Sequence, residues 1–366
     1  SHLGTQVIAA CALINVSKVL TYVMGMSILF AVGVVAAQRF GAKDYSTIGA
    51  IFQQAILLST IISLIIGLCF YYMDTILASL GQEKILMPAI KQFFHTAIWG
   101  ILPEFLLVIC QQTCFAIKKQ RLVITCNIIT FIFYLPVAYV FIHGIKLPHT
   151  ATLFAGITFH SLGVKGLAYA FIFSSTFNLL ILLCVMKSKK SFARYQLFSL
   201  HRHKGLQHVR KLAHIGWPMC VQFTGEVLIF TIIGLLIGQY GEDSLAAFQV
   251  VVQWQGLCIV PIFGISDAVS IIVGHAAGAK KLNDLNPILN ATLILVGGLA
   301  AVVLLIYVSI PTLLAEIYGV PKSATQTLDL ITVFFQYASI GLFLDALRDN
   351  IIGALRGLHD TQFAMW

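Results

Sequence analysis

The sequence predicts an all-α polytopic membrane protein, built as a two-lobe helix bundle with a parallel internal repeat. Hydrophobic residues make up 59% of the chain and charged residues only 10%, and the mean hydropathy is +0.92. A soluble protein carries roughly 25% charged residues. Two further observations support this fold class: nine apolar runs of membrane-spanning length, and a segment that occurs twice.

Each apolar run is long enough to cross a hydrocarbon core of about 30 Å, which takes about 20 helical residues. The strands of a transmembrane barrel need only about 10 residues and alternate in polarity, so a barrel is excluded. The predicted helices cover residues 6–37, 45–73, 88–117, 121–143, 163–187, 208–238, 243–275, 284–314 and 324–356.

The placement of positive charge predicts the orientation in the membrane. Most of the 23 lysines and arginines lie in alternate connections between the apolar runs. The positive-inside rule makes these connections cytoplasmic. The net charge of +9 is therefore attributed to topology, and we expect no nucleic-acid partner because basic and aromatic residues are not interleaved.

Residues 4–43 recur without a gap as residues 241–280. Both copies begin with glycine, continue with an alanine pair and close on Gly-Ala-Lys. Internal repetition in a membrane protein is typical of transporters, whose substrate sites lie between the repeats.

The repeat also predicts how the chain is organised. The run 208–238 precedes the second copy and has no counterpart before the first, whereas four runs follow the first copy and two follow the second. We infer a parent of twelve helices in two halves of six with the same orientation, in which one helix is missing at the amino end and two at the carboxyl end. We assign residues 1–190 to a first lobe, 191–207 to a basic cytoplasmic linker and 208–366 to a second lobe.

The sequence offers no enzymatic arrangement. The eight cysteines lie in or near helix runs without a CxxC pair, and neither a Walker A motif nor a dinucleotide glycine pattern occurs. We therefore predict no enzyme activity, no catalytic residue and no cofactor, and expect an ion gradient or a partner to supply the energy.

Ionisable residues at membrane depth are the candidate functional residues. A charge at the bilayer centre costs roughly 2.5–3.5 kcal/mol on insertion scales, so such groups usually face an interior cavity and act there. Glu226 and Asp345 both fall near mid-helix. Each carboxylate could take a proton or hold Na⁺ through its oxygens, so we predict that these two residues bind a coupling cation.

Other ionisable residues extend the candidate site. Asp349 lies four residues after Asp345 and shares its helix face, so the two could form a cation site, and Arg348 could instead neutralise Asp345. We expect Asp267, which follows a proline kink, to line a cavity or form an interhelical hydrogen bond. Lys18 is expected in a cavity.

Glu104 also lies within an apolar run, directly after Pro103. Its position in the outer-to-middle part of that helix predicts exposure to water.

Three segments of the sequence resemble motifs of one family of membrane transporters. GWPMCVQFTGE at 216–226 looks like the G-x-P-x-x-x-Q-x-x-x-E pattern that opens the second lobe of multidrug and toxic compound extrusion (MATE) transporters. The repeated segment resembles the second and eighth helices of that family, and LDALRDNIIGALRGLHD at 344–360 resembles its tenth helix. The first and second lobes would then hold helices 2–6 and 7–10 of the family pattern.

The resemblance implies a NorM-like secondary antiporter in a bacterial plasma membrane, which works as a monomer among membrane lipids. It would export cationic or amphipathic drugs or toxic metabolites in exchange for Na⁺ or H⁺, by rocking of its two lobes. The cation-binding carboxylates of that branch fall on Glu226 and Asp345, and the glutamine of the pattern falls on Gln222, which becomes a candidate cavity or cation-site residue.

Two alternatives stay open. A flippase for a lipid-linked precursor belongs to the same superfamily, although its cavity would need more positive charge than the intramembrane residues here supply. An inactive or scaffolding membrane protein is the other alternative.

Overall fold

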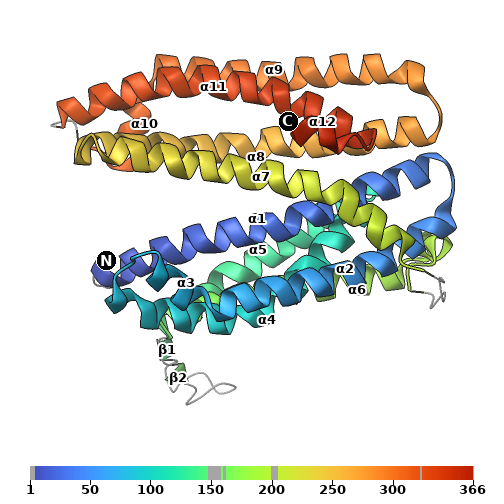
Figure 1. Cartoon of the computed structure of the whole chain (residues 1–366), viewed down its shortest axis with the longest axis horizontal. Helices are drawn as coiled ribbons and strands as arrows, with labels where there is room; N and C mark the ends of the chain where they lie inside the picture. The colour runs from blue at the N-terminus through green and yellow to red at the C-terminus, as the bar shows by residue number, and fades with distance from the viewer. Residues whose placement is uncertain (1–4, 147–157, 160–161, 199–204, 322–323, 366) are drawn as a thin grey trace. The chain divides into compact units, whose positions relative to one another are not determined.

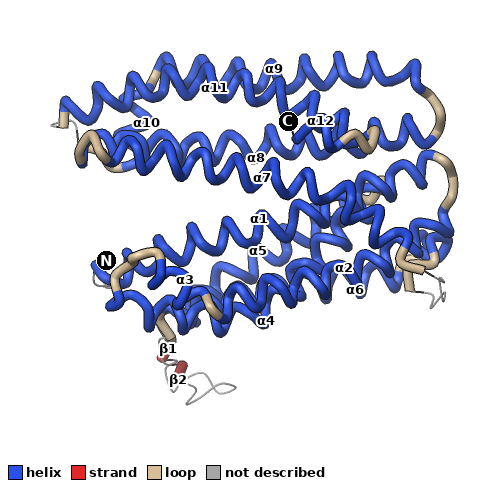
Figure 2. Tube along the Cα trace, viewed as in Figure 1, coloured by secondary structure: helices blue, strands red, loops and turns tan. Residues whose placement is uncertain are grey.

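The structure of the chain, a computed structural model, describes residues 5–146, 158–159, 162–198, 205–321 and 324–365. Within these residues helices are joined by loops and turns, and the described strands form one short antiparallel pair (Figure 1, Figure 2). In the described part, nine helices are long and apolar enough to cross a membrane. The predicted fold class, a helical polytopic membrane protein, is confirmed.

The long helices correspond one to one with the nine predicted runs. They are α1 (Thr5–Gly41), α2 (Tyr45–Tyr71), α4 (Met87–Ala116), α5 (Gln120–His143), α6 (Val164–Ser188), α7 (Gln207–Gly238), α8 (Glu242–Gly278), α9 (Leu285–Ser309) and α11 (Thr325–Gly357). Large apolar side chains such as Leu64, Trp99 and Ile294 are exposed on them, as helices surrounded by lipid require.

Short elements fill the connections between the long helices. They are α3 (Met73–Ser79), η1 (Lys84–Leu86), β1 (Ile145–Lys146), β2 (Thr158–Phe159), η2 (Lys190–Tyr195), η3 (Leu282–Asp284), α10 (Pro311–Tyr318) and α12 (Thr361–Met365). In the strand pair, Ile145 lies opposite Phe159.

The predicted run 284–314 is divided in the structure. α9 ends at Ser309 and Pro311 occupies the first turn of α10. Proline has no backbone N–H and excludes the helical conformation from the residue before it, so it starts a helix far more readily than it continues one.

Contacts divide the chain into two compact units. Unit 1 comprises residues 1–36 and 44–220, and unit 2 comprises residues 37–43 and 221–366. The division falls within α1 and α7 rather than in the basic segment before α7. Residues 199–204 of the proposed linker lie outside the described residues, and the division into two transporter lobes stays a prediction.

Unit 1 is packed around α4 and α6, with α2 against α4 and α5 against α6. The buried Tyr22 ring of α1 lies edge-on to Phe105 and Phe171, with centroid separations of 5.7 and 5.5 Å. Edge-to-face aromatic pairs of this kind add roughly 0.5–1.5 kcal/mol beyond their buried area.

Unit 2 is packed around α11, which lies against α8 and α9. Its core is made of apolar side chains from α8, α9, α10 and α11, among which Tyr307 and Phe335 are almost fully buried. The core excludes the charged side chains of α11, which gather on another part of the helix.

The two copies of the repeat end in the same backbone conformation. Lys43 and Lys280, the last residues of the two Gly-Ala-Lys sequences, have φ of 59° and 58°. A left-handed lysine is uncommon, so its occurrence at the same repeat position supports a common origin of the two segments.

The ends of these segments also contact each other within unit 2. A Cβ placed on Gly41 would collide with the carbonyl oxygen of His275, and one on Gly278 would collide with that of Gln38. Glycine at both positions permits this reciprocal approach of two backbones.

Candidate functional site

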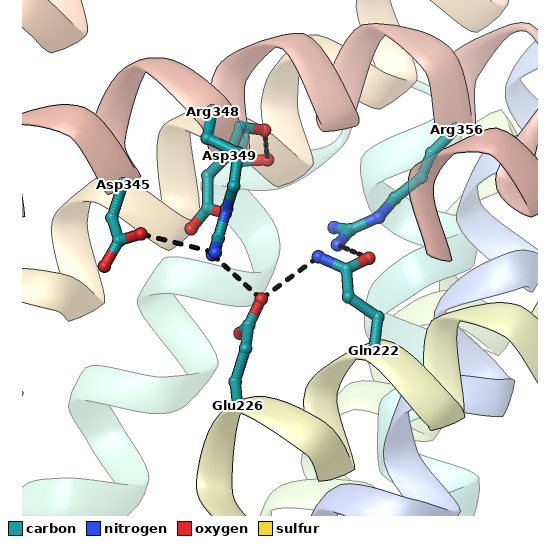
Figure 3. A network of polar contacts seen from close by, with 7 residues as sticks. Gln222, Glu226, Asp345, Arg348, Asp349 and Arg356 are labelled. Carbon is teal, nitrogen blue, oxygen red and sulfur yellow. Dashed lines mark hydrogen bonds and ion pairs between the residues drawn. The ribbon is translucent and has the colours of Figure 1, made fainter. Parts of the chain in front are cut away.

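The candidate site is centred on Arg348 of α11, in unit 2 (Figure 3). The guanidinium Nη2 lies 2.9 Å from Glu226 Oε1 and 3.0 Å from Asp349 Oδ1, and Nη1 lies 3.3 Å from Asp345 Oδ1. Three carboxylates therefore share one cation.

Helix spacing explains why α11 supplies three members of this network. Positions three and four apart lie on one face of a helix, which places Asp345 beside both Arg348 and Asp349. The burial of the two aspartates differs, because the side chain of Asp345 is 37% exposed and that of Asp349 is 11% exposed.

Glu226 comes from α7, where Gln222 lies one turn before it. Gln222 Nε2 donates to Glu226 Oε1 at 3.1 Å, and Gln222 Oε1 accepts from Arg356 at 2.9 Å. The same Glu226 oxygen thus accepts from both Gln222 and Arg348, and Gln222 links Glu226 to a second arginine.

Arg356 is the member of the network that the sequence did not indicate as a site residue. Its position near a helix end suggested a cytoplasmic topology charge, yet it is only 4% exposed and lies 4.6 Å from the ring centroid of Phe223. Asp267 of α8 interacts with it electrostatically. Its place two turns beyond Asp349, on the same helix, was the signal that could have indicated it.

Close packing of α11 against α8 fixes the position of these charges. A Cβ on Gly353 would lie 2.5 Å from the Ser266 carbonyl oxygen, and one on Gly357 would lie 2.6 Å from that of Ser270. This pair has the small-xxx-small spacing that lets membrane helices approach closely. Ser266 Oγ also donates to the Asp349 carbonyl oxygen at 2.5 Å.

Lys18 lies apart from this network, in unit 1. It lines a cavity of about 360 Å³ together with Glu104, Tyr134 and Ser175. Glu104 is half-buried and accepts from Ser175 at 2.6 Å, so it faces a cavity inside the unit.

The structure thus brings together five of the predicted site residues, places a sixth at the edge of their network and separates the seventh. Gln222, Glu226, Asp345, Arg348 and Asp349 form one connected network. Asp267 joins its edge through Arg356, and Lys18 belongs to the cavity of unit 1. Among the described residues, no group of three or more His, Cys, Asp or Glu side chains could hold a metal ion.

The helices, the repeat and the intramembrane charges define a multi-pass membrane protein of the transporter class. The MatE family model matches residues 1–140 and 218–366. The chain belongs to the MatE family of multidrug transporters, so it is a transporter and not an enzyme.

Individual relatives agree with this membership. The chain is 25% identical to a probable multidrug resistance protein NorM of Xylella fastidiosa, over 100% of this chain and 75% of the relative. A probable NorM protein of Synechococcus is 26% identical over 100% of this chain and 76% of its own length.

Solved structures share the fold. A mutant of the Vibrio cholerae MATE transporter VcmN matches with a TM-score of 0.84 at 16% identity, covering 99% of this chain and 78% of that one. The eukaryotic MATE transporter AtDTX14 matches with a TM-score of 0.81 at 17% identity, covering 99% and 77%.

Proposed function

We propose that the protein is a secondary antiporter that exports cationic or amphipathic drugs or toxic metabolites in exchange for Na⁺ or H⁺, through rocking of two lobes in a bacterial plasma membrane. In this proposal Glu226 and Asp345 bind the coupling cation. The observation that carries the proposal is the convergence of both carboxylates on the Arg348 guanidinium.

In this proposal Arg348 competes with the coupling cation for the carboxylate oxygens. Its guanidinium forms ion pairs with Glu226 Oε1 and Asp345 Oδ1. An entering cation would bind to these same oxygen atoms. A Na⁺ ion, which prefers oxygen ligands, has to compete with Arg348 for them. A proton on either carboxylate would likewise remove one partner of Arg348.

The charge balance of the network favours a monovalent cation. Within the hydrogen-bonded network, three carboxylates against the guanidiniums of Arg348 and Arg356 leave one negative charge when all are ionised; this count does not include Asp267, which acts on Arg356 from the edge of the network. A single Na⁺ or H⁺ would neutralise that charge, which matters inside a membrane because net charge there is costly. Cation entry and the release of Arg348 would then bias the helices α7 and α11 towards a different arrangement.

The test is efflux of ethidium, a fluorescent organic cation, from proteoliposomes that hold the protein. A Na⁺ gradient and a pH gradient are imposed in turn, and the wild type is compared with Glu226→Gln and Asp345→Asn. We expect one gradient to drive efflux and both variants to abolish the gradient-dependent part.

Matched controls use the same chemical changes at exposed positions of unit 2. Glu242→Gln, at the start of α8, and Asp329→Asn, near the start of α11, remove a carboxylate outside the network. Efflux that survives in both site variants would overturn the assignment of the coupling residues. Absence of gradient-driven efflux in the wild type would overturn the antiporter proposal.

A further inference from the structure

The charged network of unit 2 has an open end and a closed end (Figure 3). At the open end the side chains of Arg348 and Asp345 are 47% and 37% exposed. The side chain of Asp349 is only 11% exposed, and Arg356 at the closed end is 4% exposed. Arg356 follows Asp345 by about 16 Å along α11, at a rise of about 1.5 Å per residue. A buried guanidinium therefore terminates a network that begins at an accessible carboxylate.

The closed end lies towards the predicted cytoplasmic side of the membrane. α11 ends at Gly357, directly after Arg356, and α7 begins at Gln207, after the basic segment. The positive-inside rule assigns both of these helix ends to the cytoplasm. A cation bound by Glu226 and Asp345 would have to pass Arg356 to reach the cytoplasm along α7 and α11.

Packing fixes the guanidinium of Arg356 at the closed end. Its Nη2 donates to Gln222 Oε1 at 2.9 Å, and its carbon lies 4.6 Å from the ring centroid of the buried Phe223. The next residue, Gly357, packs closely on α8, and its carbonyl oxygen accepts from Gln38 Nε2 at 3.2 Å. The closed end is thus filled by a positive charge and by close helix packing.

The charge of Arg356 is permanent, because a guanidinium is not deprotonated in proteins. Its hydrogen bond to Gln222 goes to a neutral amide, which leaves that charge in place. Glu226, Asp349 and Asp267 act on it electrostatically, so they hold the guanidinium and would also hold an entering cation. An arginine in a narrow path repels cations and protons that move towards it.

We infer that Arg356 is an electrostatic barrier that stops the coupling cation from leaking through unit 2 into the cytoplasm when no drug is exported. This inference rests on the proposed antiport and adds a residue that determines coupling instead of cation affinity. Arg348 competes with the cation at the open end, whereas Arg356 blocks its onward passage. A cation that enters beside Asp345 then has to leave by the open end, so it crosses the membrane only when the transporter changes conformation.

A leak assay tests the barrier on the full chain in proteoliposomes without any drug. The lumen contains no Na⁺, and valinomycin with a K⁺ gradient sets a potential that is negative inside. Uptake of radioactive Na⁺ and acidification of a lumenal pH dye are both recorded. We expect the wild type to be as tight as protein-free liposomes. Arg356→Gln should raise the uptake of the coupling cation by about tenfold or more, because the rate of passage depends exponentially on the barrier height.

Two further variants separate charge from packing. Arg356→Lys loses the planar guanidinium but keeps the positive charge, so it should stay tight when measured well below its melting temperature. Gln222→Glu leaves Arg356 in place and sets a carboxylate beside it, so the leak should rise as in Arg356→Gln. Arg210→Gln, which removes an exposed charge of α7, is the control and should stay tight. Elution as a single species in size-exclusion chromatography shows that each variant is folded.

The inference is overturned if Arg356→Gln and Gln222→Glu are both as tight as the wild type. It is also overturned if Arg356→Lys leaks as much as Arg356→Gln, since packing and not charge would then seal the closed end. Gln222→Glu carries the test alone if Arg356→Gln does not fold. Because the leak assay contains no drug, ethidium efflux judges the antiport separately. Wild-type efflux together with tight variants would overturn only the barrier, whereas a wild type without gradient-driven efflux would overturn the antiport on which it rests.

Discussion

Arg348 of α11 donates to Glu226 of α7 at 2.9 Å, and this contact joins two helices that are 122 residues apart in sequence. The guanidinium is 47% exposed and the glutamate 29% exposed at their side chains. The contact is therefore open enough for a small cation to reach it. The strength of exposed ion pairs is modest, so a competitor can displace it.

Replacement of Arg348 should strengthen cation binding. Arg348→Gln frees the oxygens of Glu226, Asp345 and Asp349 and leaves their mutual repulsion for the cation to relieve. We expect the Na⁺ or H⁺ concentration for half-maximal ethidium efflux to fall by about tenfold, equivalent to about 1.4 kcal/mol. Arg210→Gln, at an exposed position of α7, is the control, and an unchanged or higher midpoint would contradict this role.

Arg356 should be required for the stability of unit 2. Arg356→Lys loses the planar contact with Phe223 and the hydrogen bond to Gln222, because an ammonium cannot reproduce the guanidinium geometry. A hydrogen bond to a charged group contributes about 1.5–3 kcal/mol, so the melting temperature in detergent should fall. Arg210→Lys should melt like the wild type, and equal melting of the two variants would refute the prediction.

Gly353 should tolerate no side chain. Gly353→Ala pushes a methyl group towards the Ser266 carbonyl oxygen, and overpacking of this kind costs about 1–3 kcal/mol. Gly341→Ala is the matched control on the same helix, since no atom lies within 4 Å of its Cβ position. Thermal melts that rank the two variants in the opposite order would show that α8 and α11 can separate at little cost.

The buried phenol of Tyr195 should make unit 1 lose stability as the pH rises into the alkaline range. Its side chain is fully buried in η2, and burial raises the pKa of its phenol, while the hydrogen bond from Arg194 lowers it less. A raised pKa in the folded state means that the stabilisation is complete below about pH 10, the ordinary value for tyrosine. It is then lost as the pH rises through the higher folded value.

The measurement for Tyr195 is the melting temperature at a series of pH values from about 8 to 11, around that ordinary pKa. Tyr195→Phe cannot ionise and should show a shallower loss of stability above about pH 10. Tyr139→Phe, at an exposed position of α5, serves as the control. If the melting temperature falls equally steeply with pH in the wild type and in Tyr195→Phe, another group causes the loss of stability at alkaline pH.

The fold could be predicted from the sequence because its determinants are local. Length and hydropathy locate each spanning helix, and the repeated Gly-Ala-Lys sequence marks equivalent helix ends such as Lys43 and Lys280. The break before α10 was missed because one proline scarcely alters the hydropathy of a long run. The strand pair of β1 and β2 was missed because each strand has two residues.

The site was harder to predict because side-chain contacts depend on helix rotation. The position of Glu226 and Asp345 near the middle of apolar runs is enough to indicate them as site residues, and helix spacing adds Arg348 and Asp349. Depth does not show that one guanidinium lies between the two helices, nor that Arg356 turns inward onto Phe223. Their roles as coupling residues stay predictions until efflux is measured.

The division of the chain within α1 and α7 has a mechanical consequence. The chain passes from one unit to the other at three places: in the turn at Lys43–Asp44, and within continuous helix at Ala36–Ala37 and at Cys220–Val221. Pro218 lies just before the crossing in α7 and removes a backbone hydrogen bond there. A bend of α7 at this proline would change the direction of the turn that carries Gln222 and Glu226.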